Sequence, residues 1–401
     1  MYPPAAAPPL PSADDSSAVS WLQALLAAAW ARGASDLHLE PYEHSYRVRL
    51  RIDGQLQPVA APPASLKERI ASRIKVLARL DIAEKRLPQD GQFRLELPAG
   101  QTGDLRVSTL PTLFGEKIVI RLLPTDNAQV QLDALGLEPL QLQQLRDAIQ
   151  RPQGMVLVTG PTGSGKTITL YSCLQALNRP DVNIASVEDP CEIRLEGINQ
   201  VHLHEKAGLD YASVLRAFLR QDPDILMVGE IRDLATADTA LKAAQTGHLV
   251  LSTLHTLDAP SALTRLQQMG VPPYQLAASI SLVVAQRLVR QLCRHCRQPQ
   301  PLHASQWLAA GLPETELASR PQAWQPVGCA HCHLGYRGRT GIFQLMPISS
   351  ELQDAMLQQA ASHQLQGLAR QLGMRSLRQA GLRKVLQGET SLQEVLHATT
   401  D

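Results

Sequence analysis

A glycine-rich segment has the composition and spacing of a phosphate-binding loop: Gly160-Pro161-Thr162-Gly163-Ser164-Gly165-Lys166-Thr167. An apolar run at 155–158 precedes it and a helix-like stretch follows, which is the context such a loop requires. Its backbone N–H groups can turn toward a polyphosphate, and the helix start favours negative charge. Lys166 is placed to reach the β- and γ-phosphates, and the Thr167 hydroxyl to ligate Mg²⁺. The segment predicts a nucleoside triphosphate site; the alternative is a glycine-rich surface turn.

Carboxylates follow two strand-like runs further along the chain. The run at 182–187 leads into Glu188-Asp189-Pro190-Cys191-Glu192, and the run at 224–228 leads into Gly229-Glu230. In a parallel sheet, such strand ends meet at the edge where ligands bind. We expect Glu230 to position the attacking water and Glu188 to act beside it. A single carboxylate after a strand is more often a helix cap, but the pair favours the functional interpretation.

A histidine closes a third strand-like run, at 249–254. His255 lies directly after that run, where its imidazole could hydrogen-bond a γ-phosphate and report its loss. A lone histidine is more often an ordinary core or surface group. His255 is therefore a candidate only in combination with the other motifs.

Four of the six cysteines form two Cys-x-x-Cys pairs separated by residues 297–328: Cys293 and Cys296, then Cys329 and Cys332. Two such pairs can offer four thiolates to one tetrahedral Zn²⁺ and leave no open position for catalysis. Four unligated thiols are the alternative. The separation implies a small helix-bearing insertion, and possible substitute ligands are His295, His331 and His333.

The elements expected around these residues form an α/β protein. Strand-like runs in the first third predict a small antiparallel sheet, and one of them alternates Arg47, Arg49 and Arg51 with apolar residues. Strands alternating with helices then predict a mostly parallel sheet. The expected regions are a disordered tail (1–15), an N-terminal α/β domain (16–123), a hinge linker (124–136), the phosphate-loop core (137–290), a tetracysteine zinc module (291–340) and a C-terminal helical region (341–401).

Composition narrows the class of protein. The 401 residues carry a net charge of +1, and aromatic residues make up 4%. No apolar run reaches the roughly 18–20 residues that span a bilayer, and the first residues lack the basic segment of a secretory signal. These features predict a soluble cytosolic protein, with reduced thiols at Cys173 and Cys191. Near-neutral charge and few aromatic residues count against a nucleic-acid motor.

Taken in order, the motifs resemble those of the secretion ATPase superfamily of bacterial type II secretion and type IV pilus systems. Besides the phosphate loop, the acidic box (188–192) and the histidine box (246–256), the matching segments are 34–41, 49–54, 87–91, 106–109, 115–117, 219–224, 229–233 and 285–289. The resemblance implies a hexameric RecA-like ATPase that binds ATP and Mg²⁺, with a PAS-like N-terminal domain before the core.

The resemblance also implies how the two domains cooperate. The N-terminal domain would swing over the nucleotide about the linker and bring Arg106 and Arg121 to the phosphates. Ordinary ion pairs are the alternative for each arginine. Further family arginines, either phosphate-facing or at subunit contacts, are Arg216, Arg220, Arg232 and Arg265.

For cellular role, the resemblance implies a homohexameric motor at the cytoplasmic face of the inner membrane. It would attach peripherally, through platform and cytoplasmic-domain membrane proteins of the machine. Retraction motors generally lack the paired cysteines, so the assembly branch is favoured. The segment Ala285–Cys293 is closer to type II secretion, which makes pseudopilus assembly the first expectation and type IV pilus assembly the alternative. A RecA-like nucleic-acid motor and a non-catalytic ATP-binding scaffold are more distant interpretations.

Overall fold

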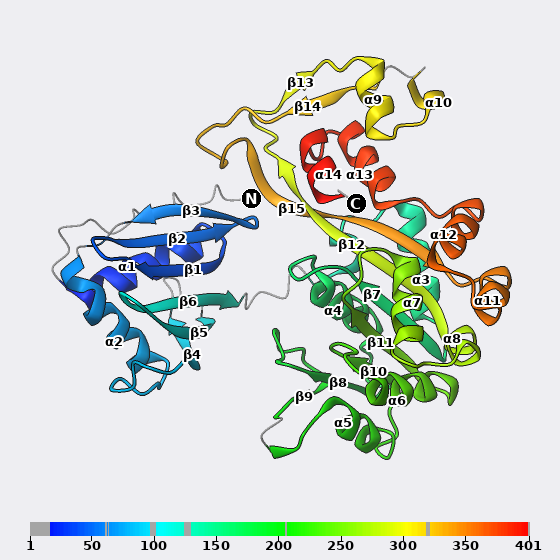
Figure 1. Cartoon of the computed structure of the whole chain (residues 1–401), viewed down its shortest axis with the longest axis horizontal. Coiled ribbons are helices and arrows are strands. Elements are labelled where there is room, and N and C mark those ends of the chain that lie inside the picture. The colour runs from blue at the N-terminus through cyan, green and yellow to red at the C-terminus, as the bar shows by residue number, and fades with distance from the viewer. Residues whose placement is uncertain are drawn as a thin grey trace. The chain divides into compact units, whose positions relative to one another are not determined.

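The computed structural model describes residues 17–60, 62, 64–96, 102–123, 130–204, 207–317 and 321–399. The chain forms two compact units, Met1–Asn127 and Ala128–Asp401 (Figure 1). The division between them falls within the segment predicted as a linker. The tail predicted at 1–15 and residues 124–129 of that linker lie outside the described residues.

The N-terminal unit is built on a six-stranded antiparallel sheet with the strand order β3-β2-β1-β6-β5-β4. The antiparallel sheet was predicted, although β3 was not. The helices are α1 (Ala18–Ala31) and α2 (Lys67–Leu77), the latter preceded by a 3-10 turn at Ala64–Leu66. The strands are β1 (Ala34–Pro41), β2 (Tyr46–Ile52), β3 (Gln55–Ala60), β4 (Gln89–Glu96), β5 (Thr102–Thr112) and β6 (Gly115–Leu123).

Alternation along the strands separates the two faces of this sheet. Val48 and Leu50 of β2 are fully buried in the core that α1 and α2 complete. The predicted row of guanidinium groups is paired with acids of β1. The Glu40 carboxylate accepts hydrogen bonds from Arg47 Nε at 3.1 Å and from Arg49 Nη2 at 2.8 Å. The charged face is therefore internally compensated.

The C-terminal unit contains a seven-stranded sheet with the order β15-β12-β7-β11-β10-β8-β9. All neighbouring pairs are parallel except β12 and β15, which confirms the predicted mostly parallel sheet. Its strands are β7 (Gly154–Thr159), β8 (Ile184–Glu188), β9 (Asn199–His202), β10 (Ile225–Val228), β11 (Leu249–Leu254), β12 (Ile280–Leu292) and β15 (Tyr336–Pro347).

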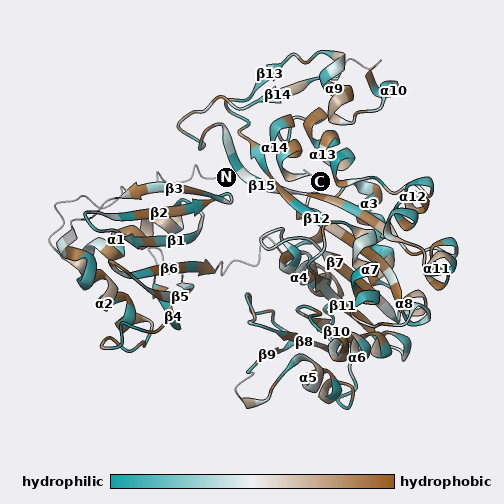
Figure 2. Ribbon diagram, in the orientation of Figure 1, coloured by the Kyte–Doolittle hydropathy of each residue, from teal (hydrophilic) through white to brown (hydrophobic). Residues whose placement is uncertain are grey.

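Helices cover both faces of this sheet. Met155 and Leu157 of β7 belong to the core lined by α5–α8, whereas Val156 and Val158 belong to the core lined by α3 and α4. The central strands are accordingly hydrophobic along their length (Figure 2). The helices are α3 (Pro139–Ile149), α4 (Lys166–Leu177), α5 (Tyr211–Phe218), α6 (Leu234–Gln245), α7 (Ala259–Gln268), α8 (Pro273–Ser279), α11 (Ser350–Leu357), α12 (Ser362–Gln371), α13 (Leu377–Leu386) and α14 (Leu392–Ala398), with a 3-10 turn at Leu132–Ala134.

The cysteine segment lies between the two long strands β12 and β15. It holds the antiparallel pair β13 (Gln298–Gln300) and β14 (Ala323–Gln325), with α9 (Ala304–Ala310) and α10 (Glu314–Leu317) between them. The insertion does carry helices, as predicted. β12 and β15 themselves run across the boundaries expected at 290 and 340. In the part of the chain that the structure describes, no helix combines the length and apolar character needed to cross a membrane.

Candidate functional site

The glycine-rich loop connects the buried strand β7 to the helix α4. Gly163 and Gly165 have φ angles of +79° and +91°, a region that side chains disfavour. A Cβ on Gly165 would also lie 2.8 Å from the side-chain nitrogen of Gln286. The loop therefore requires glycine both for its backbone conformation and for the close approach of β12.

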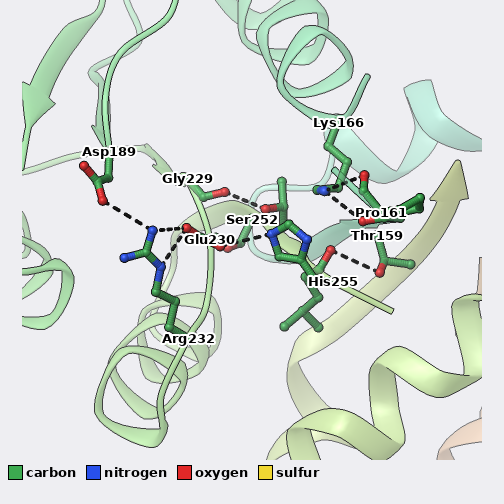
Figure 3. Close-up of polar contacts among 12 residues, drawn as sticks. Thr159, Pro161, Lys166, Asp189, Gly229, Glu230, Arg232, Ser252 and His255 are labelled. Carbon is green, nitrogen blue, oxygen red and sulfur yellow. Dashed lines mark hydrogen bonds and ion pairs between the residues drawn. The ribbon is translucent and has the colours of Figure 1, made fainter. Parts of the chain in front are cut away.

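Lys166 begins α4 and folds back over the loop. Its Nζ donates hydrogen bonds to the carbonyl oxygens of Gly160 at 2.8 Å and Pro161 at 3.2 Å (Figure 3). Burial lowers the pKa of Lys166, the Glu230 and Glu192 carboxylates oppose that shift, and the Arg287 charge adds to it. The ammonium group is thus held by carbonyl dipoles that a phosphate can replace.

Two further observations agree with a polyphosphate bound at this loop. The hydroxyl of Ser164 is buried and has no hydrogen-bond partner among the described residues. The first N–H groups of α4 lack partners within the helix, which is general at helix starts. Thr167 is half-buried beside Lys166. A phosphate group would satisfy donors that the protein itself leaves without acceptors.

Glu230 lies just after β10, on a turn that hydrogen bonds to β11 hold in place. Thr253 Oγ1 donates to the carbonyl of Gly229 at 2.6 Å, and the N–H of Ile231 donates to the carbonyl of Thr253 at 3.1 Å. The following helix, α6, is capped by Asp233, whose carboxylate accepts from the N–H of Thr236 at 2.8 Å. The Glu230 side chain is therefore carried by a rigid backbone.

Two groups contact the Glu230 carboxylate. His255 Nε2 lies 3.1 Å from Oε2, and Arg232 Nε donates to Oε1 at 2.7 Å. Arg232 also reaches Asp189 Oδ2 at 3.3 Å (Figure 3). The structure thus brings together Glu230 and His255, two of the residues singled out from the sequence. Because β7, β10 and β11 are parallel, these groups and Lys166 lie at the same edge of the sheet.

Glu188 has different surroundings. It is the last residue of β8 and only 3% exposed. Its carboxylate accepts hydrogen bonds from the hydroxyl of Tyr171, from Ser186 Oγ at 2.7 Å and from Gln200 Nε2 at 3.3 Å. The carboxylate predicted to act beside Glu230 therefore faces protein donors inside the domain.

Glu192, four residues further on, is an exposed member of the acidic box. Together with Glu230, it is one of the two carboxylates whose charge acts on Lys166. Sequence reasoning identified the box but assigned its role to Glu188. Glu192 could have been recognised from its position beyond the strand end. Side chains there do not follow the inward–outward alternation of the strand, which buries Glu188.

Arg106 and Arg121 lie in the N-terminal unit, opposite each other on β5 and β6. The structure thus brings the two predicted arginines together on one sheet. Arg121 Nε contacts Asp36 Oδ1 at 3.1 Å, and its side chain is 59% exposed. Arg121 therefore forms an ion pair in this structure, which is the alternative considered for each arginine.

The four paired cysteines form one cluster. Their Sγ atoms all lie within 4.8 Å of one another, with distances of 3.8 Å for Cys293–Cys329 and 3.6 Å for Cys296–Cys332. Zn–S bonds of about 2.3 Å in tetrahedral geometry place sulfur atoms roughly 3.8 Å apart. The donor set and its spacing therefore fit Zn²⁺.

The histidines of the cysteine pairs do not join the cluster. The rings of His295 and His331 lie 4.7 Å apart and contact each other, and among the described residues the group that could hold a metal ion consists of the four thiols. The insertion packs through Trp307 and Ala323 against Leu382 and Val395 of the C-terminal helices. None of the six cysteines forms a disulfide, and Cys173 and Cys191 are the two that were expected to be plain reduced thiols.

Comparisons with known proteins agree with this architecture. The family model described as "Type II/IV secretion system protein" matches residues 11–397. The chain is 50% identical to the type IV pilus assembly ATPase PilB of Acinetobacter baylyi, over 97% of this chain and 67% of the relative. It is 46% identical to the type II secretion system protein E of Aeromonas hydrophila, over 97% of this chain and 77% of the relative.

A solved structure shares the fold. The ATPase DotB of Legionella pneumophila superimposes with a TM-score of 0.71 at 19% identity, covering 96% of this chain and 97% of DotB. The family expected from the ordered motifs is therefore confirmed. The chain belongs to the type II/IV secretion system protein family, alongside the ATPases of type II secretion and type IV pilus assembly.

Proposed function

We propose that this protein is an ATPase motor that converts ATP and water into ADP and phosphate to assemble a pilus-like fibre. The observation that carries the proposal is the position of Glu230 at the sheet edge, between His255 and Arg232, with its charge acting on Lys166. A phosphate loop binds nucleotide, but turnover also requires a group that orients water toward the γ-phosphate.

In this scheme, the loop residues Gly160–Thr167 hold the triphosphate. Lys166 exchanges its carbonyl partners for β- and γ-phosphate oxygens. The Thr167 hydroxyl and the Glu192 carboxylate would hold Mg²⁺, which neutralises phosphate charge when bound. Hydroxyl and carboxylate oxygens are the ligands that Mg²⁺ prefers.

Glu230 accepts a hydrogen bond from the attacking water and orients it in line with the γ-phosphate. His255 contacts the same carboxylate at 3.1 Å and is half-exposed, so it can donate to a phosphate oxygen. Arg232 restrains the carboxylate from the other side. These three side chains come from the ends of two neighbouring strands, β10 and β11.

Coupling to motion is assigned to the N-terminal unit. Arg106 and Arg121 would reach the phosphates when that unit closes over the nucleotide, with the segment 124–136 as the hinge. The family resemblance supports this step. A guanidinium group on γ-phosphate charge is worth roughly 10³–10⁵ in rate in other phosphoryl-transfer enzymes, so closure would gate hydrolysis.

The assembly proposed is a homohexamer at the cytoplasmic face of the inner membrane, held there by membrane proteins of its machine. The tetracysteine cluster would hold a structural Zn²⁺. Relatives from pilus assembly and from type II secretion are similarly close, at 50% and 46–47% identity. Type II secretion remains our first expectation from the segment after Ala285, with pilus assembly as the alternative.

The proposal is tested by Glu230→Gln. The variant should bind ATP as the wild type does, because Lys166 and the loop are intact, and should hydrolyse it about 10²–10³-fold more slowly, since the water loses its acceptor. Fluorescent-nucleotide titration and phosphate release measure the two steps. Glu196→Gln, an exposed carboxylate of the same unit, is the control. Turnover near the wild-type rate in the Glu230 variant would contradict the assigned role.

A further inference from the structure

The acidic segment after β8 is anchored by a buried polar cluster that the proposed chemistry does not use. The cluster consists of Glu188, Tyr171, Ser186 and Gln200. Tyr171 and Ser186 are fully buried, and Glu188 is 3% exposed. Tyr171 belongs to α4, the helix that the phosphate loop opens, and Gln200 to β9. The cluster therefore joins the nucleotide-binding helix to two strands of the sheet.

The hydroxyl of Tyr171 connects this cluster to the acidic segment. It donates to Glu188 Oε2 and accepts from the backbone N–H groups of Glu192 at 3.1 Å and Ile193 at 3.5 Å. A phenol has one proton to donate. Because that proton is given to Glu188, the oxygen lone pairs stay directed at the two N–H groups.

Gln200 fixes the same segment from the other side. Its Nε2 donates to Glu188 Oε1 at 3.3 Å and to the carbonyl of Ile193 at 3.0 Å. Its Oε1 accepts from the N–H of Leu195 at 2.8 Å. Residues 189–195 form no helix or strand, so bonds from side chains take the place of a regular backbone ladder.

Charge and burial keep the Tyr171 hydroxyl protonated, so that it continues to donate to Glu188. Burial, and after it the charge of Glu188, raises the pKa of Tyr171 far above its ordinary value, so the phenol keeps its proton. The buried carboxylate in turn is stabilised by three donors. The acidic segment is thus tied to a rigid anchor, and it carries the exposed Glu192 whose charge acts on Lys166.

We infer that Tyr171 and Glu188 are positioning residues, which fix the backbone of the acidic segment and so the place of the Glu192 carboxylate, without touching the nucleotide. The inference rests on the proposed ATPase function. It also replaces the direct role that the sequence suggested for Glu188 by an indirect one. Groups that orient a metal ligand typically change metal affinity or activity about 10–100-fold when they are removed.

The first test is Tyr171→Phe, which keeps the buried ring and removes the hydroxyl. In the full-length protein, we expect kcat to fall about tenfold and the Mg²⁺ concentration for half-maximal activity to rise about tenfold. Affinity for a fluorescent ATP analogue in EDTA should stay within about twofold, because Lys166 and the loop are unchanged. Unaltered Mg²⁺ dependence in an active enzyme would overturn the inference.

Tyr336→Phe is the matched control. Tyr336 is also buried, and its hydroxyl contacts Ser391 at 2.8 Å, far along the chain from the acidic segment. Losing this hydroxyl should lower the stability of the fold, but it removes no hydrogen bond to the segment that carries Glu192. The control should therefore leave the Mg²⁺ dependence at the wild-type value, and a shift equal to that of Tyr171→Phe would reduce the effect to general destabilisation.

A double-mutant cycle separates the positioning role from a catalytic one. If Tyr171 and Glu188 act through one path, Tyr171→Phe, Glu188→Gln and the double variant should each lose about tenfold in kcat. If Glu188 takes part in the chemistry itself, its loss should match that of Glu230→Gln and multiply with the tyrosine variant. The second pattern contradicts the inference.

Hydrogen–deuterium exchange gives a readout that does not depend on turnover. In the nucleotide-free protein, the amides of Glu192 and Ile193 should exchange at least about tenfold faster in Tyr171→Phe than in the wild type, because they lose their acceptor. Unchanged exchange overturns the inference even in an inactive protein. A wild type without ATPase activity but with the exchange difference would instead contradict the proposed function alone.

Discussion

The two sheets carry their charged side chains in different places. In the N-terminal unit, helices cover one face and the charges occupy the other, where Glu40 contacts Arg47, Arg49 and, at 3.4 Å, Lys117. In the C-terminal unit, helices cover both faces, and Glu230 and His255 lie where strands end. The difference follows from strand direction, because parallel strands are usually buried on both sides.

The comparison separates charged side chains that pair with one another on a sheet face from charged side chains that lie where strands end. A face of paired charges contributes mainly to folding, since each acid already has its cations. A sheet edge leaves its groups next to a loop that can admit a ligand. We therefore expect substitution of Glu40 on the N-terminal face to change stability, and substitution of Glu230 at the C-terminal edge to change turnover.

The largest effect should come from Lys166→Ala. Removing the ammonium group should abolish measurable ATP binding at micromolar nucleotide and lower turnover by about 10²–10³-fold or more, with little change in thermal stability. Fluorescent-nucleotide titration and a melting curve measure both. Lys242→Ala, which removes an exposed helical ion pair with Asp238, should leave binding intact. Strong nucleotide binding by the Lys166 variant would break the comparison.

The next effect concerns the thiol cluster of the C-terminal unit, whose first member follows the end of β12. Replacing Cys329 and Cys332 with serine should release the metal and lower the melting temperature, because structural zinc contributes directly to folding. Elemental analysis and calorimetry report both quantities. His333→Ala should retain the metal, since four thiols complete the site. Loss of zinc in the histidine variant would show that an imidazole takes part.

The smallest effect is a pH dependence of the N-terminal unit. Burial raises the pKa of Glu40, but the hydrogen bonds and charges of Arg49 and Arg47 outweigh it, and the net pKa lies below the ordinary 4.5. A lowered folded-state pKa stabilises the fold above the unfolded-state value, and that stability is lost as pH falls through the folded-state value. Glu40→Gln should therefore cost about 1–2 kcal/mol at pH 7 and much less near pH 3.

Urea titration at the two pH values measures this difference. For this measurement, Trp307 and Trp324 are replaced with phenylalanine. The remaining tryptophans, Trp21 and Trp30, lie in the N-terminal unit, so their fluorescence reports its unfolding. Asp104→Asn is the control, because its ion pair with Arg94 is exposed and such pairs contribute little. An equal cost of Glu40→Gln at both pH values would rule out ionised pairing as the cause.

The sequence predicted best what depends on contiguous residues. The phosphate loop is recognised from eight consecutive residues, and the thiol cluster is recognised from two Cys-x-x-Cys pairs. Helix and strand positions in the central sheet also followed from local patterns. Residues 236–245, for example, show helical spacing in the sequence, and α6 spans Leu234–Gln245.

Features set by distant partners were harder to predict. The hydrogen-bond partners of Glu188 are such a feature, because Tyr171 lies 17 residues before it along the chain and Gln200 lies 12 residues after it. The long pairing of β12 with β15 joins Leu282 to Pro347, across the whole cysteine segment. Register between strands so far apart is fixed by tertiary packing rather than by either strand's own pattern.

The strand β12 has a consequence of its own. Near its middle, Gln286 accepts a hydrogen bond from Thr169 of the nucleotide-binding helix at 2.7 Å, and one residue past its end stands Cys293 of the thiol cluster. Successive side chains of a strand point to opposite sides. The path from Gln286 to Cys293 also includes a register shift between Arg290 and Leu292, so an added or lost residue in it would displace the glutamine or the thiol from its partner. The number of residues between Gln286 and Cys293 is thus as constrained as their chemical identity, because one strand links the thiol cluster to the helix that follows the phosphate loop.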